Sequence, residues 1–325
     1  MSTATVLATP AVGIGIDVSK DKLDLAIRLS NQKYVESSFA NNIQGINSLC
    51  VFLKQQEAAK AAPLVIESTG DYHLQSALMI KQRNFNVKLI NPITTKRYQK
   101  SSIRNAKTDK IDAKRLSDVA ILEQDLPDFN GNIKQVRARK LVSLLAHMEK
   151  TKQQLAMSLK RFEETAKTIE LKHSLVHLKK SSLELNKQIK KTTLALAESM
   201  PEKIKQQADR TKGLSREKLA VVHTLLDGKH FNNRDQLSAF FGIDIAVRKS
   251  GKWSGKSKLS KRGNPYARKV LYQIAWGMKT HNEIFRACYV RYRESNYHYN
   301  TILMILARKF LRLYFSYNLK GTANI

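Results

Sequence analysis

The chain has 325 residues, and its 57 Lys and Arg against 27 Asp and Glu give a formal net charge of +30. This length can hold two or three compact units, and the charge favours a polyanionic partner such as DNA or RNA. Cys50 and Cys288 lie far apart, which excludes a cysteine-rich zinc module and indicates a reducing compartment. No signal peptide or bilayer-spanning run is indicated, so we expect a cytoplasmic protein without a membrane partner.

The first ninety residues predict an α/β domain. Three strand-like segments come first, and helices and strands then alternate, which is the order of a ribonuclease H-like sheet. A plain doubly wound domain would normally place a helix after its first strand. The predicted strands are 12–16, 23–29, 34–39, 64–66 and 87–90, and the predicted helices are 43–62 and 72–83.

Residues 134–200 are rich in Leu, Lys, Gln and Glu and contain no Pro or Gly. Two series of positions with alternating spacings of four and three predict coiled-coil packing, either as two helices or as one long helix with a phase break near 163–170. We expect this segment to serve dimerisation or spacing. The series are Leu141, Leu145, Met148, Lys152, Leu155, Leu159, Phe162, and Leu171, Leu175, Leu178, Ser182, Leu185, Ile189, Thr192, Leu196.

Pro201 opens a third, helical unit, with helices expected at 216–226, 234–241, 265–279 and 299–319. Residues 248–269 contain nine Lys or Arg and no acidic residue. The fold class is therefore α/β followed by α. The expected domains are 1–130 (the sheet), 131–200 (the coiled coil) and 201–325 (the helical unit).

Four carboxylates stand in short motifs. Asp17 and Glu67 each follow an apolar strand, and Asp109 and Asp112 share one face of a helix because they are three residues apart. Individually, Asp17 can cap a turn, Asp109 can stabilise a helix N-terminus, and Asp112 can pair with a cation on the next turn. Together they predict a site for Mg²⁺ or Mn²⁺, which prefers carboxylate oxygen and polarises phosphate. The nearby Asp21, Asp24, Asp71 and Asp118 are expected to be solvated or structural.

The basic segment offers a second kind of group, the hydroxyl of Ser250 or Ser254. Its cations can hold a scissile phosphate beside a serine, whose hydroxyl needs a base or a metal ion to become a nucleophile. Trp253 can stack on a base. The predicted nucleic-acid-binding residues are Arg248, Lys249, Lys252, Trp253, Lys256, Lys258, Lys261 and Arg262.

These motifs resemble those of a known family. The stretches Gly-Ile-Asp-Val-Ser-Lys, Ile-Glu-Ser-Thr-Gly and Lys-Thr-Asp-Lys-Ile-Asp-Ala, the Leu-rich centre and the late Ser-Gly look like the DEDD transposases of bacterial insertion sequences. This is the IS-one-ten family, which includes the Piv and MooV DNA invertases. The resemblance spans nearly the whole chain in the correct order.

The resemblance implies a RuvC-like domain in which Asp17, Glu67, Asp109 and Asp112 bind metal. It also implies a serine in the C-terminal transposase domain that links covalently to DNA. In the family this serine stands eight residues after a glycine that ends a helix, and Gly242 to Ser250 has that spacing. The expected setting is a homo-oligomer, a dimer or tetramer, in the bacterial nucleoid. The expected partners are the element ends, target DNA and a structured bridge RNA.

Ile245 stands where the family often has Pro, three residues after the glycine. A Piv-type site-specific invertase with the same chemistry remains the alternative, and DNA flanking the gene would discriminate. A RuvC-like junction resolvase would need the carboxylates but not Ser250. A non-enzymatic RNA-binding scaffold would need neither.

Overall fold

A computed structural model describes residues 10–56, 61–68, 72–92, 95, 109–123, 125–166, 172–246, 249–250, 253–254 and 258–319. At residues 109–110, 166, 172–174, 246, 249–250, 253–254 and 258 it describes the backbone alone. The chain forms two compact units, Met1–Ile133 and Lys134–Ile325. None of the described helices is both long and apolar enough to cross a bilayer.

The first unit contains a five-stranded mixed sheet in the order β3-β2-β1-β4-β5. β1 pairs antiparallel with β2 and parallel with β4, and β5 continues the parallel side. This confirms the predicted ribonuclease H-like order of strands. The strands are β1 (Ala11–Val18), β2 (Lys22–Leu29), β3 (Tyr34–Ala40), β4 (Leu64–Glu67) and β5 (Val87–Ile90).

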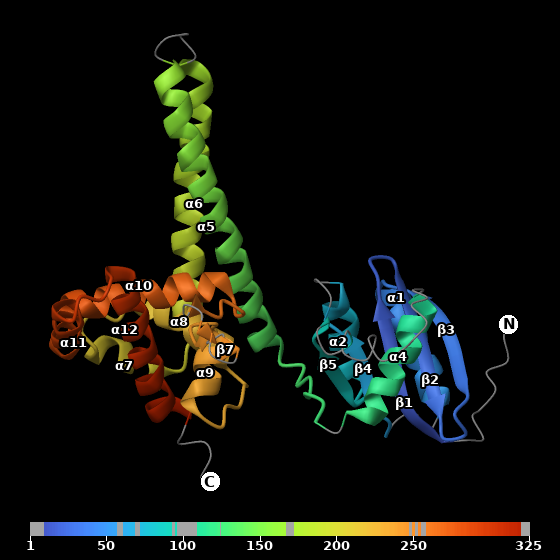
Figure 1. The fold of residues 1–325 in the computed structure, drawn as a ribbon. Coiled ribbons are helices and arrows are strands. Elements are labelled where there is room, and N and C mark those ends of the chain that lie inside the picture. Colours follow the sequence, from blue (N-terminus) through green and yellow to red (C-terminus); the bar gives the residue numbers. More distant parts are fainter. Residues whose placement is uncertain are drawn as a thin grey trace. The chain divides into compact units, whose positions relative to one another are not determined.

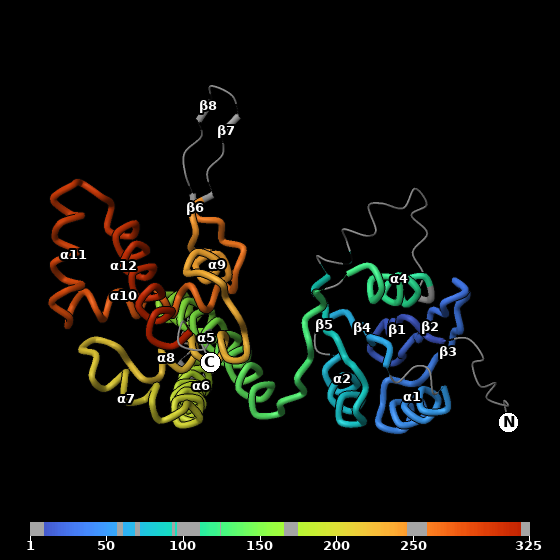
Figure 2. The backbone as a smooth tube through the Cα atoms, turned by 90° about the horizontal axis from the view of Figure 1, so that it is seen from below, coloured from blue at the N-terminus to red at the C-terminus, as the bar shows by residue number. Residues whose placement is uncertain are grey.

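Helices cover both faces of this sheet. α1 (Ile43–Gln55) and α2 (His73–Lys81) lie on one face, and α4 (Asp109–Leu122) lies on the other (Figure 2). Because helices shield both faces, the central strands are buried and apolar. α1 ends at Gln55, before the predicted end at residue 62, and 57–60 lie outside the described residues.

Polar contacts anchor α4 to the strands beneath it. Asp118 on α4 accepts hydrogen bonds from the Arg28 guanidinium and, at 2.7 Å, from the Tyr34 hydroxyl. Lys114 Nζ lies 2.7 Å from Glu36 Oε1. Burial and the donation to Asp118 together raise the pKa of Tyr34 to about 12. α4 is thus fixed against β2 and β3 by side chains as well as by packing.

The second unit begins with two long helices, α5 (Ile133–Ala166) and α6 (Lys172–Glu198). They lie side by side and antiparallel (Figure 1), and Lys179 Nζ pairs with Glu163 Oε1 across them at 2.6 Å. Of the two predicted arrangements, the structure has two helices. Among the described seam positions, Lys152, Phe162 and Leu178 are exposed and the others are buried or half-buried. Leu171 lies outside the described residues.

The remaining helices pack around a core that includes the base of the α5–α6 hairpin. Val142, Leu145 and Leu196 are buried there with α8, α10 and α12. The four predicted helices are confirmed, while α7 and α11 were not predicted. The helices are α7 (Glu202–Arg210), α8 (Arg216–Leu226), α9 (Arg234–Phe240), α10 (Pro265–His281), α11 (Glu283–Glu294) and α12 (Tyr299–Tyr314), with a π-helical turn at Phe315–Leu319.

Between α9 and α10 the chain forms short antiparallel pairs. β6 (Ile245–Ala246) pairs with β9 (Lys258–Leu259), and β7 (Lys249–Ser250) pairs with β8 (Trp253–Ser254). We call residues 245–259 the serine hairpin. Its base is closed by two hydrogen bonds, from Ser260 N to Asp244 O at 3.0 Å and from Lys261 N to Gly242 O at 3.1 Å.

Candidate active site

Asp17 and Glu67 lie at the carboxyl ends of adjacent parallel strands. Ile16 on β1 is in register with Ile66 on β4, so the next residues of the two strands lie side by side. Residues in register point to the same face of a sheet. Both carboxylates are half-buried. The structure therefore brings two of the four predicted ligands to one point on the sheet edge.

The packing of α4 on β1 shows which way Asp17 points. A methyl group added at Gly13 would meet Ser117, Ala120 and Ile121; one added at Gly15 would meet Ala113, Leu116 and Ser117. Two residues along the strand thus correspond to a step of four residues back along the helix. The two lengths agree, because two residues of a strand span about 6.6 Å and four residues of a helix span about 6 Å.

The same correspondence between β1 and α4 extends to the next residue of β1 that faces α4. Asp17 is two residues beyond Gly15 and shares its face. Four residues back from Ala113, Leu116 and Ser117 are residues 109, 112 and 113, which belong to the first turn of α4. Asp17 accordingly points toward the turn that carries Asp109 and Asp112.

Glu67 lies on the same side of the sheet. Val65, two residues before it, packs against Leu116 of α4 in a buried cluster, so the alternation of the strand turns Glu67 toward α4 as well. The buried Thr95 donates its hydroxyl to Glu67 Oε2 at 2.6 Å. Sequence reasoning missed Thr95, because nothing in the sequence marks its approach to Glu67.

The two α4 carboxylates differ in what the structure describes. Asp112 Oδ1 accepts a hydrogen bond from Arg115 Nη1 at 2.9 Å, so the alternative of pairing with a cation on the next turn is realised. Asp109 is described by its backbone alone. Among the described side chains, no three acidic, His or Cys residues are close enough to hold a metal ion together.

Asp24 on β2 is a further carboxylate close to Asp17. It is directly opposite Asp17 in the β1–β2 pairing and is only 3% exposed. Ser38 donates a hydrogen bond to its Oδ1 at 2.5 Å, and Lys22 Nζ lies 2.7 Å away. The expectation of a structural role holds for Asp24, and Asp118 likewise anchors α4. Asp71 lies outside the described residues.

Ser250 belongs to the second unit, in the serine hairpin. Its backbone pairs directly with that of Trp253. The glycine expected to end a helix does so: Gly242 has φ +64°, and the N–H groups of Gly242 and Ile243 bond to the carbonyls of Ala239 and Ser238 at 2.9 and 3.1 Å. The side chain of Ser250 lies outside the description.

The predicted nucleic-acid-binding residues fall into three groups. Lys261 and Arg262 are described and exposed at the base of the hairpin. The second group, Lys249, Trp253 and Lys258, is described by backbone alone. The third group lies outside the described residues: Arg248, Lys252 and Lys256.

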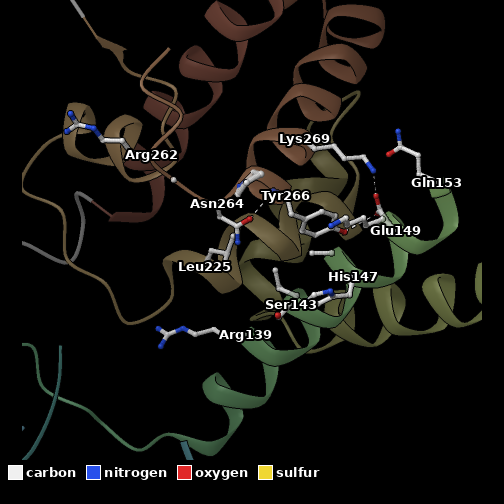
Figure 3. Close-up of a pocket in the computed structure, with 15 residues that line it drawn as sticks. Arg139, Ser143, His147, Glu149, Gln153, Leu225, Arg262, Asn264, Tyr266 and Lys269 are labelled. Atoms are coloured by element: carbon white, nitrogen blue, oxygen red, sulfur yellow. Dashed lines mark hydrogen bonds and ion pairs between the residues drawn. The ribbon is translucent and has the colours of Figure 1, made fainter. Parts of the chain in front are cut away.

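Arg262 lines a cavity of about 810 Å³ between α5 and the start of α10 (Figure 3). Its wall carries five basic or imidazole side chains and one carboxylate, Glu149, which accepts a hydrogen bond from Tyr266 Oη at 3.0 Å and pairs with Lys269. Burial and the charge of Glu149 raise the pKa of Tyr266. With Glu149 paired to Lys269, the cavity keeps a positive balance from Arg139, Lys150 and Arg262.

A ribonuclease H-like sheet with acidic residues at its strand ends, followed by a helical unit with a basic hairpin, defines the DEDD class of transposases. Two protein-family models match the chain: one described as "Transposase" over residues 14–169, and one described as "Transposase IS116/IS110/IS902 family" over residues 211–290. The chain belongs to this family of insertion-sequence transposases. Membership implies that it binds DNA and uses a divalent metal ion. No curated relative matches the chain.

Proposed function

We propose that this transposase cleaves and exchanges DNA strands with two sets of groups: the metal-binding carboxylates Asp17, Glu67, Asp109 and Asp112, and the nucleophile Ser250. The observation that carries the proposal is the alignment of α4 on β1. It turns the two strand-end carboxylates toward the helical turn that holds the other two. Four carboxylates in one place would repel one another strongly unless cations lay among them.

Asp17, Glu67, Asp109 and Asp112 would hold Mg²⁺ or Mn²⁺. The donor set fits, because both ions are hard and prefer carboxylate oxygen. When bound, the ion polarises a phosphodiester and makes a nearby hydroxyl easier to deprotonate. Thr95 restrains the orientation of Glu67 through its hydrogen bond, and Arg115 restrains Asp112. These two residues position the ligands before a metal ion arrives.

Ser250 Oγ attacks the scissile phosphorus in this proposal. The hydroxyl gives up its proton as the Oγ–P bond forms, the P–O3′ bond breaks, and the 3′ oxygen takes up a proton as it leaves. The strand stays attached through a phosphoserine, so exchange needs no free double-strand break. The paired backbone of β7 and β8 supports the serine, and the cations of the hairpin attract the phosphate.

A bridge RNA and an oligomer complete the proposed assembly. The net charge of +30 exceeds what a single DNA duplex site needs and suits two nucleic acids. On the coiled coil, Met157, Phe162 and Leu183 are 61%, 51% and 63% exposed. Apolar side chains exposed along one helical hairpin favour contact with another copy of the chain. RNA sequencing after purification from host cells tests the RNA partner, and recovery of no specific RNA refutes it.

The metal site is tested with Asp17→Asn in the full chain, using Asp21→Asn as the matched control. Asp21 is exposed and only four residues away, so the two variants make the same charge change near the same strand. We expect Asp17→Asn to weaken Mn²⁺ binding in calorimetry and to abolish cleavage while DNA binding survives. Asp21→Asn should behave as wild type. Equal Mn²⁺ affinity in both variants would contradict the proposed ligand role of Asp17.

The serine is tested by trapping the protein–DNA adduct. Ser250→Ala should leave no covalent adduct on denaturing gels, whereas Ser254→Ala should retain it. An adduct that persists in Ser250→Ala and disappears in Ser254→Ala would move the nucleophile to Ser254. A Piv-type invertase gives the same adduct, so a plasmid assay that scores insertion against inversion separates the two functions.

A further inference from the structure

A second basic cavity lies between α11 and α12. It has a volume of about 440 Å³ and is separate in its lining from the cavity beside Arg262. Three of its lining residues are Cys288, Tyr292 and Ile305. The other four are all cationic: Arg291, Arg308, Lys309 and Arg312. We call it the α11–α12 pocket.

The cations of this pocket are not balanced by ion pairs with carboxylates in the described part of the chain. Among the described residues, none of its four cations takes part in an ion pair. Arg308 Nε donates to the backbone carbonyl of Ile243 at 2.6 Å. Lys309 Nζ lies 5.2 Å from the Phe285 ring centre, and the Arg291 guanidinium lies 5.2 Å from that of Tyr292. A carbonyl and two rings orient the cations but leave their charge in place.

The fold thus holds like charges together in a concave site. Arg308 is partly buried, and burial and the charge of Arg312 lower its pKa, with Asp244 the acidic residue that offsets part of this effect. Repulsion between cations grows as solvent is excluded. An anion inside the pocket would relieve it.

We propose that the α11–α12 pocket binds a phosphodiester group of a nucleic-acid backbone. Guanidinium groups match phosphate because their planar donors can form two parallel hydrogen bonds, and three of the four cations are arginines. The ring of Tyr292 offers an apolar surface for a sugar or base. The inference rests on the proposed function as a nucleic-acid recombinase, and it adds a binding site that lies mostly beyond residues 211–290 matched by the family model.

The pocket is also linked to the serine hairpin. Arg308 lines the pocket and bonds to Ile243, which is two residues before β6. Asp244, the next residue, closes the base of the hairpin through its hydrogen bonds with Ser260. A backbone phosphate held at Arg308 would therefore fix a strand relative to the base of the hairpin that carries Ser250.

The test uses the full chain with Arg291→Gln and Arg312→Gln combined. Both residues are exposed, and Arg308 is left intact because it supports Ile243. Fluorescence anisotropy measures binding to duplex DNA and to RNA of equal length over a range of salt, with EDTA present. We expect binding to weaken about tenfold and the salt slope of log K to fall by about 1 to 2.

The matched control is Lys33→Gln combined with Lys54→Gln, which removes two exposed positive charges from the first unit. A loss on DNA alone assigns the phosphodiester to DNA, and a loss on RNA alone assigns it to RNA. A loss on both supports a backbone site without discrimination. A change no larger than that of the control, on both ligands, overturns the proposal. Because EDTA removes divalent metal, this result is independent of the carboxylates and of adduct formation by Ser250, so a failure of either proposal can be recognised separately.

Discussion

Replacing Gly15 by Ala tests whether the alignment of α4 on β1 builds the metal site. The added methyl group would overlap the carbonyl of Ala113 and would lie 2.7 Å from Leu116 Cβ. Because backbone cannot rotate away as a side chain can, the helix must withdraw by roughly 1 Å. That movement carries Asp109 and Asp112 away from Asp17 and Glu67.

The expected magnitude follows from this displacement. Overpacking costs about 1–3 kcal/mol of stability, and a misplacement of about 1 Å at a reacting centre costs on the order of 100-fold in rate. Gly45→Ala is the matched control. Its methyl group would overlap the carbonyl of Ala40 to a similar degree, but Gly45 lies on α1, across the sheet from α4. Both variants should lose stability, and only Gly15→Ala should also lose cleavage activity.

The assay is the rate of metal-dependent strand cleavage, measured at a temperature where thermal unfolding shows that both variants are folded. Gly13→Ala gives an intermediate case, because its methyl group would overlap mainly with the carbonyl of Ser117, farther from the carboxylates. Equal cleavage rates in Gly15→Ala and Gly45→Ala would refute the reasoning. Overpacking on either face of the sheet would then reduce cleavage equally, and displacement of α4 would have no separate effect.

Three other variants test single contacts. Tyr34→Phe removes the hydrogen bond to Asp118, and urea unfolding should show a loss of about 1–2 kcal/mol. Burial lowers the pKa of His223 below 6.5, so the folded state favours the neutral imidazole and stability should fall as pH decreases from about 7 to about 5. In His223→Asn the thermal midpoint should depend less on pH over this range. An unchanged pH dependence of the midpoint would contradict this role of His223. Gly242→Ala places a methyl group at positive φ, against Gly263 N and Arg262 N. We expect the free energy of unfolding to fall by at least about 1 kcal/mol and proteolysis within the serine hairpin to become faster. Proteolysis of the hairpin at the wild-type rate would count against this contact.

The order of elements could be predicted from the sequence because burial follows regular spacing in most of them. The strands of the sheet are apolar runs, and the coiled-coil positions repeat every three and four residues. α11 escaped prediction because Phe285 is its one buried residue in the described structure, so it has little apolar periodicity. Its start is set instead by Asn282, whose side chain accepts hydrogen bonds from the N–H groups of Ile284 and Phe285 at 3.1 and 3.3 Å.

Some features of the candidate site could be predicted from the sequence and others could not. The position of Asp17 and Glu67 at the ends of two buried strands could be predicted, because a carboxylate that follows an apolar run is conspicuous in the sequence. Thr95 and the burial of Asp24 could not, because both depend on segments that are distant in sequence. The pairing of Asp112 with Arg115 was foreseen only as one alternative, since spacing of three on a helix permits an ion pair without requiring it.

Two glycines in the sequence also indicate where α4 packs. Gly13 and Gly15 alternate with Ile14 and Ile16 just before Asp17, so the two positions that precede the carboxylate on its face of β1 have no side chain. Glycine weakens a strand and marks a place where another backbone approaches closely. Here α4 packs on that part of the face, and it does so because Gly13 and Gly15 lack side chains. The two glycines therefore set the direction in which Asp17 points and select the helix it can meet, which makes them as much a part of the candidate metal site as the carboxylates are.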